Sequence, residues 1–271
     1  MASSGWSGRT LGVIGGGNMA EALIRGVLSS GLLPAASVTV FDILPARRKV
    51  FADLGCTAAE SASTAAGADA VLIATKPQTM REALSGSAAR DDQLFISIAA
   101  GIPSRVIEDM LGGGARVVRV MPNTPLLVGA GMAAVCGGAK ARPDDVELAV
   151  ALFSCCGRAV RVDESLMDAV TALSGSGPAY LFRFAETLMA GGEKLGLAPD
   201  LARELTIGML EGSAKMLTQN SDAARLRENV TSPGGTTAAA LNVFEERGFP
   251  GLVADAMKAA RDRGVELGRD Q

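Results

Sequence analysis

The chain has no histidine among its 271 residues. This absence excludes a Ser-His-Asp triad, a histidine general base and histidine metal ligands. The four cysteines, Cys56, Cys136, Cys155 and Cys156, lack the spacing of a zinc site or of a disulfide framework. We therefore predict no metal and interpret the cysteines as buried, small hydrophobic residues. Chemistry in this chain must use a cofactor, backbone groups, hydroxyls, carboxylates or lysine.

Charge and long apolar runs are also scarce. Charged residues make up 20% of the chain, and the formal net charge is −3 with no strong basic patch, which argues against nucleic acid as a partner. No apolar run reaches the roughly 18 residues that cross a bilayer, and residues 1–9 lack the apolar core of a signal peptide. We expect a cytoplasmic protein that binds neither nucleic acid nor membrane. Hydrophobic residues, at 48%, are sufficient for a large core.

A glycine-rich turn near the N-terminus follows a predicted strand and precedes a helical pattern. The strand is Leu11–Ile14, and the turn reads Gly15-x-Gly17-x-x-Ala20. This order is the fingerprint of a dinucleotide-binding βαβ unit. Gly15 permits the tight turn, Gly17 lets the backbone approach a pyrophosphate, and Ala20 lets the helix pack close to the strand. The phosphates would lie at a helix N-terminus, which favours negative charge.

The first half of the chain alternates short apolar runs with helical patterns. The predicted strands are Leu11–Ile14, Val38–Phe41, Ala70–Ala74, Leu94–Ala99, Arg116–Val120, Met132–Cys136 and Ala159–Val162. The predicted helices between them are Ala20–Ser29, Ala46–Leu54, Thr79–Leu84, Ser104–Leu111 and Asp144–Phe153. Such alternation predicts an α/β fold, in which a mainly parallel, Rossmann-type doubly wound sheet has helices on both faces. We place this dinucleotide-binding domain at residues 1–163.

Residues 164–271 show only helical patterns. The longest are Pro178–Leu195, Pro199–Leu217, Thr236–Glu246 and Gly251–Leu267, and taken together they are rich in alanine, glycine and methionine. Helices that are apolar over so much of their circumference must be buried, and about 100 residues can hardly bury them alone. We therefore predict an all-helical dimerisation domain that packs against another subunit.

Two further glycine-rich segments each precede a predicted helix. Residues 173–180 read L-S-G-S-G-P-A-Y, and residues 229–237 read N-V-T-S-P-G-G-T-T. Both are expected to place small hydroxyl residues and open backbone N–H groups at a helix N-terminus. Simple N-capping, typically about 1 kcal/mol, is one interpretation. A site for a small carboxylate is the other, and the two segments by themselves leave both open.

Together these motifs resemble the pyrroline-5-carboxylate reductase family over nearly the whole chain. The segments that carry the resemblance are G-G-G-N-M-A at 15–20, A-T-K-P at 74–77, S-I-A-A-G at 97–101, R-V-M-P-N-T-P at 119–125, L-S-G-S-G-P-A-Y at 173–180 and V-T-S-P-G-G-T-T at 230–237. The last three together are highly specific, whereas the first alone is not.

The resemblance implies reduction of 1-pyrroline-5-carboxylate to L-proline, the last step of proline biosynthesis, by hydride transfer from NADPH or NADH to the cyclic imine. A protonated imine already carries the positive charge that invites hydride, so neither a metal nor a strong acid is needed. The resemblance also implies an interlocked homodimer, which in the family often assembles into a ring of dimers. The active site would lie between the cofactor domain of one subunit and the helical domains of the dimer.

The same resemblance implies which residues bind the cofactor. These are Gly15, Gly16, Gly17, Asn18 and Met19 of the glycine turn; Ala74, Thr75, Lys76, Pro77, Ala99 and Ala100 at strand ends; Pro122 and Asn123, with Met121, near the nicotinamide; and Asn229 from the helical domain. Ends of parallel strands are where ligands bind in this architecture. A solvated surface lysine is the alternative interpretation of Lys76.

The substrate site implied by the resemblance lies mainly in the last glycine-rich segment. Gly235, Thr236 and Thr237 would hold the substrate carboxylate, and Thr237, the implied catalytic residue, would also hydrogen-bond the ring nitrogen. The pocket would be shaped by Ser174, Gly175 and Ser176.

Two departures from the family pattern bear on these assignments. The second strand ends at Asp42, whose carboxylate would accept hydrogen bonds from a ribose 2′-hydroxyl and favour NADH. Arg47 and Arg48 follow and could instead bind a 2′-phosphate, so the choice of cofactor stays open. Many relatives also carry a His-Pro pair where this chain has Asp222 and Ala223, which puts a substrate contact from that loop in doubt.

Two other functions are compatible with a dinucleotide-binding fold. A β-hydroxyacid-type dehydrogenase would need a catalytic lysine, for which Lys194 and Lys215 are the candidates, although their surroundings do not suggest the role. A non-catalytic dinucleotide-binding sensor is the other alternative. The complete threonine-containing segment at 230–237 argues against the sensor.

Overall fold

The computed structural model describes residues 5–85, 89–90, 93–112 and 114–269, which form two compact units. The first unit comprises Met1–Ser176 together with Ala260–Gln271, and the second comprises Gly177–Ala259. The last helix, α12 (Phe249–Arg269), therefore begins in the second unit and ends in the first.

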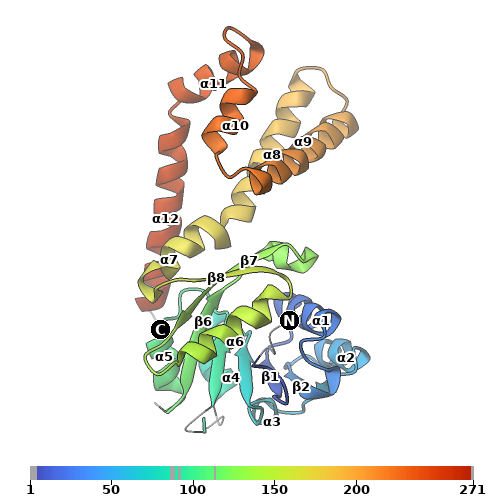
Figure 1. Cartoon of the computed structure of the whole chain (residues 1–271), viewed down its shortest axis with the longest axis vertical. Helices are drawn as coiled ribbons and strands as arrows, with labels where there is room; N and C mark the ends of the chain where they lie inside the picture. Colours follow the sequence, from blue (N-terminus) through green and yellow to red (C-terminus); the bar gives the residue numbers. More distant parts are fainter. Residues whose placement is uncertain (1–4, 86–88, 91–92, 113, 270–271) are drawn as a thin grey trace. The chain divides into compact units, whose positions relative to one another are not determined.

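The first unit is built on an eight-stranded sheet with the order β3-β2-β1-β4-β5-β6-β7-β8 (Figure 1). The strands are β1 (Leu11–Ile14), β2 (Val38–Phe41), β3 (Thr57–Ala58), β4 (Ala70–Ile73), β5 (Leu94–Ser97), β6 (Arg116–Met121), β7 (Gly131–Gly137) and β8 (Gly157–Arg161). All pairs are parallel except β6 with β7. The first six strands have the order of a Rossmann fold, which confirms the predicted fold class.

Helices cover both faces of this sheet, as two separate apolar clusters show. The helices are α1 (Asn18–Ser30), α2 (Pro45–Asp53), α3 (Ala62–Ala65), α4 (Met80–Leu84), α5 (Ser104–Met110) and α6 (Pro143–Ser154). Leu72 of β4 packs in one cluster with side chains of α1 and α6. Its neighbours Val71 and Ile73 pack in the other cluster with α4 and α5. Because successive strand residues face opposite sides, β4 is buried along its whole length.

The predicted long elements of the first unit agree with the structure within a few residues, but β3 and α3 were not predicted. Both are too short to show a periodic pattern. The four cysteines are unpaired; Cys155 is half-buried and the other three are buried. Among the described residues, no helix is long and apolar enough to span a bilayer.

The second unit is helical, as predicted. Its elements are α8 (Gly177–Lys194), α9 (Pro199–Gln219), α10 (Ala223–Asn229), α11 (Thr236–Glu246) and the first part of α12. Many apolar side chains are exposed in the single chain; Phe182, for example, is 61% exposed and Leu195 is 88% exposed. Exposure on this scale is typical of a surface that another protein covers.

The sequence prediction around Asn229 needs correction. The segment 229–237 was expected only to precede a helix, but its first residue, Asn229, is also the last residue of α10. The carboxylate of Asp222 caps this helix by accepting the backbone N–H of Arg225 at 3.0 Å. Asp222 therefore starts a short helix.

The prediction of an open loop before α8 was also wrong. The chain is already helical in α7 (Met167–Val170) and continues in a single π-helical turn, Thr171–Gly175, hereafter the π turn. The N–H of Ser176 donates to the carbonyl of Thr171 at 2.8 Å. Since that N–H is used within the turn, this segment does not present the free helix N-terminus that its glycines and serines suggested.

Candidate active site

The glycine turn after β1 has the geometry predicted for Gly15. This residue has φ +100°, a conformation that favours glycine, and its N–H donates to Phe41 O at 2.8 Å. A Cβ on Gly15 would lie only 2.7 Å from the carbonyl carbon and oxygen of Ala74. The turn from β1 to α1 can therefore pass the end of the neighbouring strand β4 only if residue 15 has no side chain.

The N-terminus of α1 is open. Gly17 is the N-cap residue, and no side chain caps the helix. A Cβ on Gly17 would meet nothing within 4 Å, and the first helical turn begins with the bond from Glu21 N to Gly17 O at 2.9 Å. The N–H groups of Asn18 and Met19 precede that bond and have no intrahelical acceptor, so they are available to an anion.

Charged side chains after β2 and in α2 hold the glycine turn and the end of β2. The carboxylate of Asp42 accepts the N–H of Gly16 at 2.7 Å. Arg47 donates from Nε to Gly16 O at 2.6 Å and pairs with Glu21 at 2.8 Å. Arg48 donates to the backbone carbonyl of Asp42 at 2.9 Å. Asp42 and Arg47 thus contact the glycine turn itself, and Arg48 contacts the backbone just after β2. These are the three residues predicted to decide the choice of cofactor.

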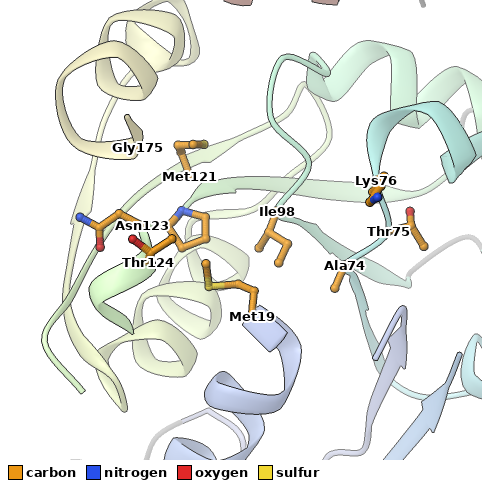
Figure 2. A pocket seen from close by; sticks show the side chains of 10 residues that line it. Met19, Ala74, Thr75, Lys76, Ile98, Met121, Asn123, Thr124 and Gly175 are labelled. Atoms are coloured by element: carbon orange, nitrogen blue, oxygen red, sulfur yellow. The ribbon is translucent and has the colours of Figure 1, made fainter. Parts of the chain in front are cut away.

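A cavity of about 290 Å³ lies at the carboxyl ends of β4, β5 and β6 (Figure 2). Its lining residues are Met19, Ala74, Thr75, Lys76, Ile98, Met121, Pro122, Asn123, Thr124 and Gly175. Ligands of open α/β sheets bind in this position, outside the strand ends. The cavity brings together predicted cofactor residues from the glycine turn, from the 74–77 segment and from the 119–125 segment.

The walls of the cavity combine apolar side chains with one unsatisfied polar atom. Figure 2 shows Met19 of α1 and Ile98, which follows β5, among the side chains that line the space. Thr75 Oγ1 is buried and has no hydrogen-bond partner in the described parts of the chain, whereas Lys76 is exposed. An unsatisfied buried hydroxyl costs free energy.

Asn123 uses its amide within the protein. Its Nδ2 donates to the carbonyl of Ser174 at 3.2 Å and, less closely, to Ser174 Oγ at 3.4 Å. Its Oδ1 accepts the N–H of Met132, the second residue of β7, at 2.8 Å. Next to these bonds, Gly175 packs against Met121, where a Cβ on Gly175 would overlap Met121 Cε. The predicted contact between Asn123 and the nicotinamide stays a prediction.

Some residues of the cavity were missed by the sequence analysis. Ile98, which directly follows β5, and Thr124 line the cavity, and the strand-end rule applied to β5 could have found Ile98. The residues predicted there, Ala99 and Ala100, are not among the lining residues, and Ala99 is buried. Pro77 begins a short 3₁₀ turn just after Lys76, the last of the lining residues that follow β4.

The predicted substrate residues of the last glycine-rich segment lie in the second unit. Gly235 is the N-cap residue of α11, and no side chain caps this helix. Thr236 and Thr237 are the first two residues of α11. The segment is held by the bond from Gly235 N to Ser232 O at 3.0 Å. The α11 N-terminus therefore has threonine hydroxyls and open N–H groups, and its contact with substrate stays a prediction.

Comparison with known proteins decides the family. A pyrroline-5-carboxylate reductase from Haemophilus influenzae is 43% identical over 265 residues, which cover 96% of this chain and 97% of that protein. The chain belongs to the pyrroline-5-carboxylate reductase family. A second family member, from Pseudomonas aeruginosa, is 42% identical over 94% of this chain and 95% of its own length.

Family models and solved structures agree with this membership. A family described as pyrroline-5-carboxylate reductase dimerisation matches residues 164–267, and one described as NADP oxidoreductase, coenzyme F420-dependent, matches residues 10–101. The reductase from Coxiella burnetii superposes with a TM-score of 0.89 at 33% identity, covering 96% of this chain and 98% of that one. The Plasmodium falciparum reductase, solved with NADP bound, has a TM-score of 0.85 at 30% identity and covers 96% and 98%.

Proposed function

We propose that this chain reduces 1-pyrroline-5-carboxylate to L-proline with NADPH or NADH. The observation that carries the proposal is the 43% identity to a pyrroline-5-carboxylate reductase over nearly the whole of both chains. The dinucleotide-type glycine turn and the cavity at the strand ends are the parts that such an enzyme requires.

The residues of the first unit fit a nicotinamide dinucleotide. The open N-terminus of α1 after Gly17 would hold the phosphates, and the unsatisfied hydroxyl of Thr75 would hydrogen-bond the cofactor. The apolar walls around Met19 and Ile98 would exclude water from the reacting ring. When bound, the reduced nicotinamide supplies the hydride.

The chain's own contribution is orientation of the imine. The open N-terminus of α11, from Gly235 to Thr237, would bind the substrate carboxylate. The hydroxyl of Thr237 would hydrogen-bond the ring nitrogen and so fix which carbon faces the cofactor. The pocket would be completed by Ser174, Gly175 and Ser176, and Asn229 would reach the cofactor from the helical domain.

Self-association is part of the proposal. The match to a dimerisation family over residues 164–267 and the exposed apolar side chains of α8 and α9 support a homo-oligomer. We propose an interlocked homodimer, with a ring of dimers as the larger assembly, and a cytoplasmic location in keeping with the biosynthetic role of the relatives.

Neither candidate lysine of the dehydrogenase alternative lines the strand-end cavity: Lys194 ends α8, and Lys215 pairs with Glu211 at 2.6 Å.

A direct assay tests the activity. Purified protein is mixed with the cyclic imine and with NADH or NADPH in parallel, cofactor oxidation is followed by near-ultraviolet absorbance, and proline is identified by mass spectrometry. Turnover with at least one cofactor, absent when the imine is left out, is the expected result. Cofactor binding without turnover would overturn the proposal and favour the non-catalytic sensor.

A further inference from the structure

A single side chain, Asn123, joins three elements at the edge of the cavity. Its Nδ2 reaches Ser174 O in the π turn, and its Oδ1 accepts the N–H of Met132 at the start of β7. Asn123 itself follows β6 by two residues. We propose that Asn123 is a positioning residue, which holds the π turn against the end of β6 and thereby forms the Gly175 wall of the cavity. Its effect on turnover rests on the proposed function.

The sequence removes one helical donor that could reach this carbonyl. In a regular α-helix, the carbonyl of Ser174 would accept the N–H of residue 178. Residue 178 is proline, which has no N–H. The amide of Asn123 supplies the missing donor at 3.2 Å. Asn123 thus gives Ser174 O a donor from outside the helix at a place where proline removes the α-helical one.

The same bond sets how closely the π turn approaches β6. Gly175 follows Ser174 directly. The Cα of Gly175 is packed so tightly on Met121 that a Cβ would overlap Met121 Cε. Both residues line the cavity, and Figure 2 shows Gly175 above Asn123 with Met121 beside them. π turns frequently occur at functional sites. Releasing Ser174 would let the Gly175 wall move away from Met121 and widen this end of the cavity.

The hydrogen bonds from Asn123 to Ser174 and Met132, hereafter the clamp, are separate from the part of the cavity that would hold the cofactor phosphates. The glycine turn is fixed by its own bonds, including those from Gly15 N to Phe41 O and from Gly16 N to Asp42. None of them involves Asn123. Loss of the clamp is therefore expected to change how the reacting groups are aligned while the affinity for the dinucleotide is kept.

The test compares Asn123→Ala with Asn220→Ala, a matched truncation at an exposed position at the end of α9. For Asn123→Ala we expect kcat to fall by at least about tenfold and cofactor Kd, measured by fluorescence titration, to stay within about threefold of wild type. Hydrogen–deuterium exchange should become faster in peptides that cover residues 171–176. Asn220→Ala should match wild type in all three measurements.

Two further variants keep the test decisive. Asn123→Asp keeps an oxygen acceptor for Met132 N–H but loses the donor to Ser174 O, so it should reproduce the kcat loss even if Asn123→Ala folds poorly. Adding Pro178→Ala to Asn123→Ala supplies a helical N–H for Ser174 O and should slow the exchange of residues 171–176 again.

Three results would overturn the proposal. Unchanged exchange of residues 171–176 in both Asn123 variants would mean that no clamp exists. A fall in cofactor affinity as large as the fall in kcat would make Asn123 a direct cofactor ligand. Turnover within about twofold of wild type would mean that the clamp does not matter for the reaction. If the wild type does not turn over the imine, the proposed function fails, whereas the exchange and cofactor measurements still test the clamp.

Discussion

The carboxylate of Asp42 accepts the backbone N–H of Gly16 at 2.7 Å, which joins the end of β2 to the glycine turn. This bond fixes a negative charge beside the turn that would hold the cofactor phosphates. The neighbouring cations are engaged as well: Arg47 pairs with Glu21 at 2.8 Å, and Arg48 contacts the exposed Glu60 at 3.4 Å. We therefore expect the choice between NADH and NADPH to depend on how these charges balance around a 2′-phosphate.

Removal of the Asp42 charge should favour NADPH. Asn at this position keeps an oxygen acceptor for Gly16 N–H and removes the repulsion of a 2′-phosphate. For Asp42→Asn we expect the ratio of kcat/KM for NADPH to that for NADH to rise by about tenfold. The control is Asp53→Asn, which removes an exposed carboxylate that pairs with Lys49 within α2. A ratio that is unchanged or lower in Asp42→Asn would contradict the assignment of Asp42 to this end of the cofactor.

Gly17→Val should abolish cofactor binding in a folded protein. A Cβ on Gly17 meets nothing within 4 Å, so the valine fits the chain itself, but it projects where the backbone must approach a pyrophosphate. We expect a loss of affinity for NADH of about 100-fold or more, with the free energy of unfolding within about 1 kcal/mol of wild type. Fluorescence titration and thermal unfolding measure the two quantities. Retained affinity would mean that the phosphates do not bind at the α1 N-terminus.

Thr237→Ala should damage substrate use and spare cofactor binding. The variant removes the hydroxyl expected at the ring nitrogen and leaves the N–H groups of the α11 N-terminus in place. We expect kcat/KM for the imine to fall by about 100-fold, with cofactor Kd unchanged. Thr237→Ser, which keeps the hydroxyl, should recover most of the activity. Equal losses for substrate and cofactor in a folded Thr237→Ala protein would place the substrate elsewhere.

The strands of the first unit could be predicted from the sequence because each is a short apolar run with no competing local signal. Leu11–Ile14 and Val38–Phe41 were predicted with the bounds that the structure has. The π turn could not be predicted in this way. Serine, glycine and proline at 174–178 favour a loop locally, whereas in the structure the segment is wound as a π turn and receives a hydrogen bond from Asn123, about 50 residues earlier in the chain. Tertiary contacts of this kind override local propensity.

The candidate site was predictable to a similar degree. The family resemblance implied Ala74, Thr75 and Lys76, which line the cavity, and the strand-end rule agrees with it because the ends of parallel strands meet at one edge of the sheet. The role of Asn123 in holding Ser174 required the structure, since no sequence spacing indicates that contact. The assignment of Thr237 came from the family resemblance and not from chemistry visible in the residues alone.

The end of α12 returns to the first unit and should tolerate no added side chain at Gly268. A Cβ there would lie 2.6 Å from the carbonyl oxygen of Gly101, in the turn after β5. We expect Gly268→Ala to lower the free energy of unfolding by about 1–3 kcal/mol in urea denaturation. Gly251→Ala on the same helix, where a Cβ meets nothing within 4 Å, should be neutral or stabilising by up to about 1 kcal/mol. Similar losses for both variants would mean that helix α12 is not seated on Gly101.

The buried thiol of Cys136 should make the folded state sensitive to alkaline pH. Burial, aided by the nearby negative charge of Glu164, raises the pKa of this thiol to about 11. In the unfolded chain the thiol titrates at its ordinary pKa of about 8.5. Above that pH the unfolded state releases a proton that the folded state still holds, so the free energy of unfolding falls until the pH passes the folded-state pKa.

The Cys136→Ala variant isolates this contribution. Tyrosine and lysine side chains also titrate in the alkaline range, so the diagnostic quantity is the difference in slope between wild type and variant, measured by urea denaturation from pH 8 to about 11 at one protein concentration. We expect the wild type to lose up to roughly 3 kcal/mol more than the variant over this range. The variant itself should be less stable than wild type at pH 8, because it leaves a small cavity beside Met167 and Ala134. Parallel pH profiles for the two proteins would show that the thiol titrates at its ordinary pKa in the folded state.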